Sequence, residues 1–223
     1  MLEARLNRAR LIARSAFADL KANANRYRRR RLSLPQYSPA RNGEPEIYFL
    51  TPDYNSPSGG VRVIYRHVDI LNASGIPAAV VHQKRGFRCD WFENSTRVLD
   101  VGRCRLGEND LLVLPETDGD LFNRLSPGAR HAIFNQNAHL TWLRDPGSVS
   151  KHLVDNPSLV GVVAVSQHNV DMLSYAFPTL DIHRVHLGID ETLFYDDAAP
   201  RPQKITYMPR RGGDDLLQVL QLL

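Results

Sequence analysis

Five short segments of this chain are continuously apolar, and this feature constrains the fold more than any other. None of them alternates between apolar and polar residues, so both faces of each strand are expected to be covered. Longer stretches with helical periodicity separate them, and strands that alternate with helices form a parallel sheet. The segments are 46–50 (EIYFL), 78–82 (AAVVH), 110–114 (DLLVL), 131–135 (HAIFN) and 160–165 (VGVVAV).

The stretches between these segments carry helix signals. Residues 60–72 place apolar side chains three and four positions apart, and Gly75 stands where a helix stop belongs. Residues 84–109 fit no element. The sequence therefore predicts an α/β fold, a Rossmann-like doubly wound parallel sheet with helices on both faces. Its further expected elements are a helical stretch near 118–125, a helix at 167–176 capped by Ser166, and a last strand at 182–187.

Composition is that of a globular chain. With 43 % hydrophobic residues among 223, the chain can bury a core, which argues against global disorder. No apolar run approaches the roughly 18–20 residues that span a bilayer, and charged residues interrupt the first apolar patches where a secretory signal would be continuous. Cys89 and Cys104 form neither a metal-binding pattern nor a disulfide framework, so we expect reduced thiols and a cytoplasmic location.

Positive charge is concentrated at the start of the chain. Residues 1–31 contain ten Lys or Arg and two acidic residues, whereas the remainder contains 18 basic and 22 acidic residues. Apolar residues of this segment lie near one helical face. We therefore expect a basic amphipathic helix within residues 1–33, the basic arm, and a Pro-rich linker at 34–45.

Several interpretations of the basic arm stay open. It is a solvated tail, a peripheral anchor on an anionic membrane surface at the inner face of the membrane, a nucleic-acid-binding segment or an organelle transit peptide. Each basic residue near anionic lipid contributes about 1 kcal/mol of attraction. No basic surface interleaved with aromatic residues follows in the body of the chain, so nucleic acid is the less favoured partner.

Polar residues crowd the positions directly after the predicted strands. In doubly wound sheets, ligands bind outside the carboxyl ends of the strands, so these positions form the candidate site. The density of polar groups exceeds what turns require. They include Asp53, His82, Gln83, Lys84, Glu116, Asp118, Asn135, Gln136, Asn137, His139, Ser166, Gln167 and His168.

The turn Ser58-Gly59-Gly60 suggests an anion site. Two glycines at a helix start let a ligand approach the backbone, and the free N–H groups and helix dipole favour a phosphate. A plain strand-to-helix turn in which glycine adopts a positive φ is the alternative. The dinucleotide-binding pattern G-x-G-x-x-G is absent, because its third glycine is missing and the preceding loop is too long.

Three features in this order resemble a known enzyme family. They are the Gly59-Gly60 turn after the first strand, the segment VVAVSQHNVDML at 162–173 and the segment VHLGIDETLFY at 185–195. Together they resemble the N-terminal half of a retaining GT-B glycosyltransferase, of the large group that includes bacterial mannosyl-, rhamnosyl- and glucosyltransferases. Leu187 departs from the family pattern, which usually has Asn there. The resemblance covers about residues 46–210.

The resemblance implies a function and a set of site residues. The enzyme would transfer a sugar with retention from a nucleotide-sugar donor to a polysaccharide or glycolipid acceptor, with the donor as substrate and with neither a cofactor nor a metal. His139 would lie near the transferred sugar as the catalytic residue. The donor diphosphate would be bound by Gly59, Gly60, Arg210 and Arg211, and the acceptor by Glu116, Asp118, Asn135, Gln136 and Asn137.

The resemblance also implies how the chain is divided. Residues 46–190 would form the Rossmann-like acceptor-side domain, 191–203 an interdomain linker, and 204–223 the start of a donor-binding domain. The chain would then be a truncated part of the enzyme, inactive by itself. One alternative is a non-catalytic Rossmann-like binding module tethered by the basic arm. A sugar-nucleotide epimerase or dehydrogenase is a weaker one, because its fingerprint is absent.

Overall fold

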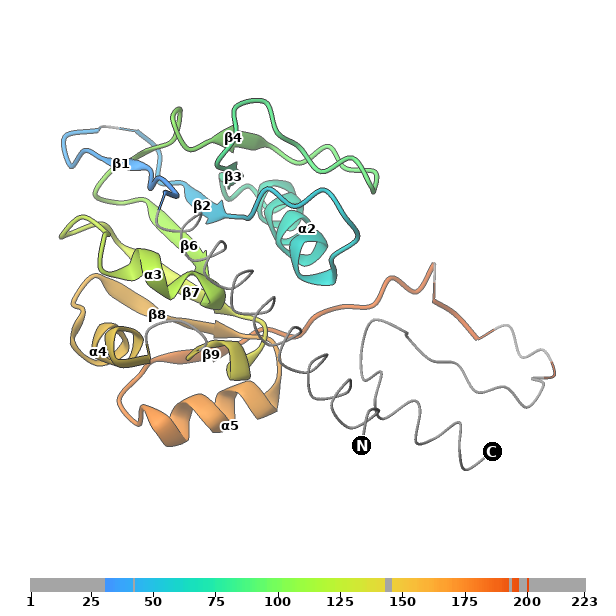
Figure 1. Cartoon of the computed structure of the whole chain (residues 1–223). Coiled ribbons are helices and arrows are strands. Elements are labelled where there is room, and N and C mark those ends of the chain that lie inside the picture. Colours follow the sequence, from blue (N-terminus) through green and yellow to red (C-terminus); the bar gives the residue numbers. More distant parts are fainter. Residues whose placement is uncertain (1–30, 42, 143–145, 193, 197–199, 201–223) are drawn as a thin grey trace, which may run out of the picture. The chain divides into compact units, whose positions relative to one another are not determined.

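The computed structural model describes residues 31–41, 43–142, 146–192, 194–196 and 200 (Figure 1). The basic arm, except for its last residues, and the predicted donor-domain segment with Arg210 and Arg211 lie outside these residues. Contacts divide the chain into two units between His186 and Leu187, close to the end predicted for the acceptor-side domain.

The first unit contains a parallel sheet of seven strands, in the order β4-β3-β2-β6-β7-β8-β9. Every neighbouring pair in this sheet is parallel. The strands are β2 (Ile47–Leu50), β3 (Ala78–His82), β4 (Val98–Asp100), β6 (Leu111–Pro115), β7 (His131–Asn135), β8 (Leu159–Ala164) and β9 (Ile182–Arg184).

The strand order contains one reversal. The first strand of this sheet in chain order, β2, lies in its interior, and β3 and β4 follow beside it toward one edge. The chain then returns to place β6 on the other side of β2 and moves outward again through β7, β8 and β9. The topological switch point therefore lies between β2 and β6, where such sheets form a crevice at the carboxyl ends of their strands. The predicted α/β, doubly wound fold is confirmed.

Helices cover both faces of the sheet (Figure 1). On one face, α2 packs its buried stripe, which includes Tyr65 and Val68, against Phe49 and Val80. On the other face, apolar residues of the remaining helices pack against Leu50 and other strand residues. Those helices are α3 (Gly119–Phe122), α4 (Pro146–Asp155) and α5 (Gln167–Ala176), while α2 is Gly59–Ala73 and two 3-10 turns are η1 (Glu116–Asp118) and η2 (Ala138–Leu140).

Residues predicted as a linker are attached to the domain. β1 (Gln36–Tyr37) pairs in parallel with β5 (Arg105–Leu106) in a separate two-stranded sheet. Arg41 forms an ion pair with the buried Asp110, whose other carboxylate oxygen accepts the N–H of Glu46 at 2.9 Å. Arg41 and Glu46 are thus held at the amino ends of the strands, while Ser33 exchanges two hydrogen bonds with Gln83 directly after β3. β4 and β5 occupy the region for which the sequence predicts no element.

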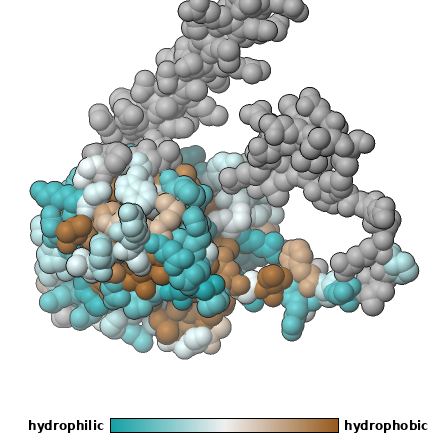
Figure 2. Space-filling model, turned by 90° about the horizontal axis from the view of Figure 1, so that it is seen from below, coloured by the Kyte–Doolittle hydropathy of each residue, from teal (hydrophilic) through white to brown (hydrophobic). Residues whose placement is uncertain are grey.

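The surface mixes polar and apolar residues. The face in Figure 2 shows hydrophilic and hydrophobic residues side by side rather than one extended apolar area. Tyr175 in α5 is 91 % exposed, and Ile70 in α2 is about half exposed. Among the described residues, the structure contains no helix whose length and apolar character would let it cross a membrane.

Candidate functional site

The carboxyl ends of β2, β6 and β7 bring several predicted site residues into one network. Gln136, directly after β7, donates its Nε2 hydrogen to the carbonyl oxygen of Gly60 at 3.2 Å. Its neighbour Asn137 donates its backbone N–H to Oε1 of Glu116 at 3.1 Å. The Asn137 side chain in turn accepts the N–H of His139 at 3.1 Å. Three segments far apart in sequence therefore meet at the switch point.

The two glycines of the turn have different surroundings. A Cβ at Gly60 would meet Oε1 of Gln136 at 2.8 Å, whereas a Cβ at Gly59 would meet no atom within 4 Å. The close approach of Gln136 therefore accounts for glycine at position 60. Neither glycine has a positive φ, since the described glycines with that conformation are Gly75, Gly86, Gly128 and Gly161. The plain-turn alternative is thus wrong in requiring a positive φ here.

The start of α2 is open to an anion. Ser58, the N-cap residue, makes no capping hydrogen bond with its side chain, and the first turn contains no acidic residue. The first N–H groups of a helix have no partner within the helix and carry its positive dipole end. Open space at Gly59 lets a phosphate oxygen approach this backbone.

Glu116 is the buried carboxyl group of the site. It is 5 % exposed and sits in η1, directly after β6. Burial raises its pKa to about 7, partly opposed by hydrogen bonds from backbone N–H groups, and the neighbouring Asp118 adds to the rise. A carboxyl group with such a pKa exchanges a proton near neutral pH, which suits general acid or base chemistry on a hydroxyl group.

Asn135 belongs to the scaffold beneath this edge. It is buried, its Nδ2 donates to Oγ1 of Thr141 at 2.8 Å, and its Oδ1 accepts from Nδ2 of Asn169 at 3.1 Å. Asn169 Nδ2 also bonds the backbone oxygen of Asn135 at 3.0 Å. The Asn135 amide is therefore engaged within the protein. The buried Asp118 lies two residues beyond Glu116 in the same 3-10 turn, and its Oδ1 accepts a hydrogen bond from the Thr117 hydroxyl group at 3.5 Å.

Two exposed histidines stand at the same edge. His139 lies in η2 and His168 in the first turn of α5, and their Nε2 atoms are 3.3 Å apart. Ser166 caps α5 as predicted, because its Oγ accepts the N–H of Asn169 at 3.2 Å. His139 is thus at the rim of the site, where the resemblance places a residue close to a transferred sugar.

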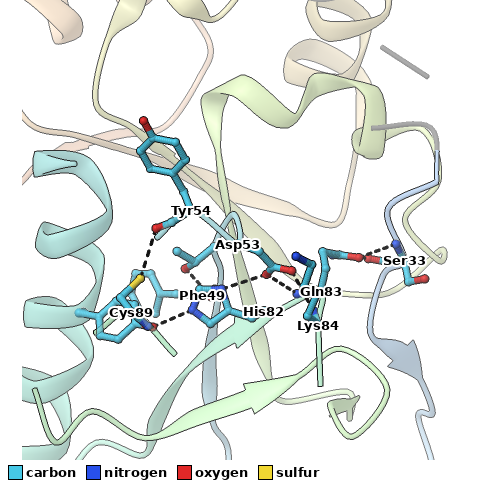
Figure 3. A network of polar contacts seen from close by, with 10 residues as sticks. Ser33, Phe49, Asp53, Tyr54, His82, Gln83, Lys84 and Cys89 are labelled. Atoms are coloured by element: carbon cyan, nitrogen blue, oxygen red, sulfur yellow. Dashed lines mark hydrogen bonds and ion pairs between the residues drawn. The ribbon is translucent and has the colours of Figure 1, made fainter. Parts of the chain in front are cut away.

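A second polar network holds the loops after β2 and β3 together (Figure 3). The carboxylate of Asp53 accepts the backbone N–H groups of Gln83 and Lys84, each at 2.9 Å, and its Oδ1 lies 3.2 Å from Nδ1 of the buried His82. The other ring nitrogen of His82 lies 2.7 Å from the hydroxyl oxygen of Tyr65 in α2. These bonds to His82, Gln83 and Lys84 lower the pKa of Asp53, although its burial opposes the change.

This network fixes the loop that leads from β2 to the Gly59 turn. Tyr65 is completely buried, and its hydroxyl oxygen also accepts the backbone N–H of Cys89 at 3.2 Å. Burial raises the pKa of the Cys89 thiol and raises that of Cys104 to about 12, so both thiols stay protonated and unreactive at neutral pH. The sequence places Asp53 and His82 directly after predicted strands but does not predict that the two side chains contact each other.

No protein-family model and no curated protein sequence matches the chain. The case for function therefore depends on the geometry of the site and on the sequence resemblance. Within the part of the chain that the structure describes, no group of three or more His, Cys, Asp or Glu side chains is placed to hold a metal ion. The predicted diphosphate ligands Arg210 and Arg211 lie outside the described residues.

A hollow of about 810 Å³ opens at the opposite edge of the sheet, away from the predicted site residues. His131, the first residue of β7, and His152 in α4 line it, and their Nε2 atoms are 2.8 Å apart. His131 Nδ1 lies 2.9 Å from the carbonyl oxygen of Ala129, and Asn156 Nδ2 lies 3.1 Å from His152 Nδ1. A carbonyl oxygen only accepts, so Nδ1 of His131 carries its hydrogen.

The rest of this chain of hydrogen bonds follows from that assignment. With its hydrogen on Nδ1, a neutral His131 accepts at Nε2 the hydrogen that His152 carries on its own Nε2. His152 then accepts from Asn156 at Nδ1, so both rings are neutral and all four nitrogens are paired. Burial lowers the pKa of both histidines, that of His152 to about 4 with a contribution from His131. We therefore interpret the His131–His152 pair as a structural element of the fold.

Proposed function

We propose that residues 46–186 form the acceptor-side domain of a retaining glycosyltransferase of GT-B architecture. One observation carries the proposal: the switch point gathers the open helix start at Gly59, the buried carboxyl group of Glu116 and the rim histidine His139 through the bonds of Gln136 and Asn137. An anion site, a proton-exchanging group and a polar rim are what transfer of a sugar from a diphosphate to a hydroxyl group requires.

Each part has a role in this proposal. In the transition state of sugar transfer, negative charge develops on the leaving diphosphate, which the N–H groups and dipole at the start of α2 stabilise. Glu116 accepts a hydrogen bond from the acceptor hydroxyl group, and His139 contacts the transferred sugar. Gln136 and Asn137 hold these groups in register. Asp118 contributes negative charge close to the acceptor.

The substrates follow from these roles. The donor is a nucleotide-sugar, and the acceptor is a polysaccharide or glycolipid hydroxyl group. Arg210 and Arg211 are proposed as further contacts to the donor diphosphate. The basic arm would hold the protein at an anionic membrane surface on the cytoplasmic side, where a glycolipid acceptor would be presented.

The proposal is tested with a pair of variants at Gly59. Gly59→Asp and Gly59→Asn have side chains of nearly the same shape, and the open space at this position accommodates both. Asp adds a negative charge where the diphosphate would bind, whereas Asn does not. We expect Gly59→Asp to weaken binding of UDP or GDP, measured by calorimetry with the full chain, by about tenfold or more relative to Gly59→Asn.

The melting temperatures of the two variants serve as the control for folding. An acidic residue in the first turn of a helix is stabilising, so Gly59→Asp should melt at least as high as Gly59→Asn. Equal affinity of the two variants for the nucleotide would remove the diphosphate site from the proposal. Absence of binding of UDP, GDP and their sugar conjugates at millimolar concentration would overturn the proposed diphosphate site at the start of α2.

A further inference from the structure

The exposed histidine pair is more widely separated than the buried pair. The Nε2 atoms of His139 and His168 are 3.3 Å apart, and the ring centroids are 5.3 Å apart. In the buried pair, His131 and His152, the same atoms are 2.8 Å apart and the centroids 4.9 Å. A hydrogen bond between nitrogens favours the shorter distance. The exposed rings therefore form only a long hydrogen bond, and their facing nitrogens remain accessible to a ligand.

The separation matches two ligands of one metal ion. Nitrogens bound at about 2.05 Å to a tetrahedral ion are about 3.3 Å apart, and the ring centroids behind them about 5.2 Å apart. A collinear hydrogen bond at 3.3 Å would instead separate the centroids of His139 and His168 by about 5.6 Å. The two distances in the protein therefore match those of two ring nitrogens that share one tetrahedral ion. A phosphate oxygen shared by two N–H donors would require a wider separation, about 4.5 Å.

The protein holds both histidines in place through their neighbours. Asn169, next to His168, is buried, and its Oδ1 accepts the N–H of Ala138, which is next to His139, at 3.4 Å. Its Nδ2 bonds Asn135 at the end of β7. One buried amide therefore ties η2 to the first turn of α5. Metal sites use this kind of support to orient their ligands before the ion binds.

We propose that His139 and His168 form an open binding site for a divalent transition-metal ion, with Zn²⁺ as the best match. Imidazole nitrogens are preferred ligands of Zn²⁺, Cu²⁺ and Ni²⁺, whereas Mg²⁺ and Ca²⁺ prefer oxygen ligands. Two protein nitrogens leave positions for water or for an oxygen of a bound molecule. The sequence predicts no metal site, because the two histidines are 29 residues apart and form no recognised spacing.

The site is tested by titrating Zn²⁺ into the full chain, prepared without a polyhistidine tag and stripped with a chelator. Calorimetry at pH 7.5 should show one equivalent bound. His139→Ala and His168→Ala should each weaken binding by about tenfold or more, and the double variant should abolish it. His183→Ala is the matched control, because His183 is also an exposed histidine, 66 % accessible and next to Asp181. It should change affinity by less than about twofold.

A spectroscopic measurement tests the ligands without any variant. The electron paramagnetic resonance spectrum of the Cu²⁺ complex should show coupling to two imidazole nitrogens. A spectrum without two such nitrogens would overturn the proposal, as would a double variant that binds Zn²⁺ like the wild type or a control variant that loses as much affinity as His139→Ala. Because no nucleotide is present, these outcomes are independent of the proposed sugar transfer.

Discussion

The two edges of the sheet use histidine pairs in opposite ways. At the amino edge, His131 and His152 are buried, neutral and hydrogen-bonded at every ring nitrogen. At the carboxyl edge, His139 and His168 are exposed, and their facing nitrogens are further apart. The residue type is the same, and burial together with the partners available decides whether it supports the fold or remains accessible to a ligand.

The same contrast extends to the carboxyl groups. Asp110 at the amino edge is satisfied by Arg41 and by backbone N–H groups, including that of Gly107 at 2.6 Å. Glu116 at the carboxyl edge is equally buried, but within the described part of the chain its hydrogen-bond partners are backbone N–H groups, and its pKa rises to about 7. The Asp110 carboxylate is thus neutralised within the protein, while Glu116 retains the capacity to exchange a proton with a bound molecule.

The largest effect is expected from breaking the buried pair. His152→Ala removes a ring stacked on Phe122, with centroids 4.8 Å apart, and leaves Nε2 of the buried His131 without its partner. We expect a loss of about 2–4 kcal/mol in the free energy of unfolding, measured by urea denaturation. His168→Ala, the matched change in the exposed pair, should cost less than about 0.5 kcal/mol. Equal losses in the free energy of unfolding for the two variants would contradict a structural difference between the two histidine pairs.

Acid should destabilise the protein through the buried pair. His152 has a pKa of about 4 in the folded protein against the ordinary histidine value of 6.5, so between these pH values the unfolded chain binds the proton and the folded protein does not. The free energy of unfolding should therefore fall as pH drops from about 6.5 to 4, by on the order of 2 kcal/mol.

The control for this pH effect is a variant that keeps the packing without the titration. His152→Phe retains a ring against Phe122 and should show a smaller loss of stability between pH 6.5 and 4. Urea denaturation of both proteins at intervals of half a pH unit measures the difference. Parallel curves for the two proteins would show that the pair does not control this pH range.

Glu116 should produce a pH effect of the opposite sign. Its pKa is raised from 4.5 to about 7 in the folded protein, so stability is fully present below pH 4.5 and is lost as pH rises through 7. Glu116→Gln keeps the acceptor for the N–H of Asn137 and removes the titration. The variant should gain on the order of 1–3 kcal/mol relative to wild type between pH 4.5 and 8, measured by thermal or urea unfolding. A constant difference would contradict a raised pKa.

The smallest effect concerns the two glycines at the start of α2. Alanine is favoured over glycine in helices by about 0.5–1 kcal/mol, and Gly59→Ala should gain part of this because its Cβ meets open space. Gly60→Ala should gain less, since Gln136 must move and lose its bond to the carbonyl oxygen at position 60. The difference should shrink in a Gln136→Ala background. Unchanged differences in that background would exclude Gln136 as the cause.

Much of the architecture could be predicted from periodicity. The strands Ala78–His82 and His131–Asn135 and the helix Gln167–Ala176 match the predicted ranges, and the other predicted elements differ by a few residues at their ends. The helix α4 (Pro146–Asp155) is the long element that the sequence pattern did not predict. These segments are long enough for their apolar pattern to identify them. β1, β4 and β5 are two or three residues long and carry no period, so the sequence gives no signal for them.

The candidate site depends on both the sequence and the tertiary structure. The sequence by itself determined that polar residues such as Glu116 and His139 follow apolar strands, because the order of elements is a local property of the chain. Only the tertiary structure decided that β6 lies beside β2, that Gln136 reaches Gly60, and that His139 faces His168. Those contacts join residues 29 to 76 positions apart, and they follow from strand order and register, which depend on packing across the whole sheet.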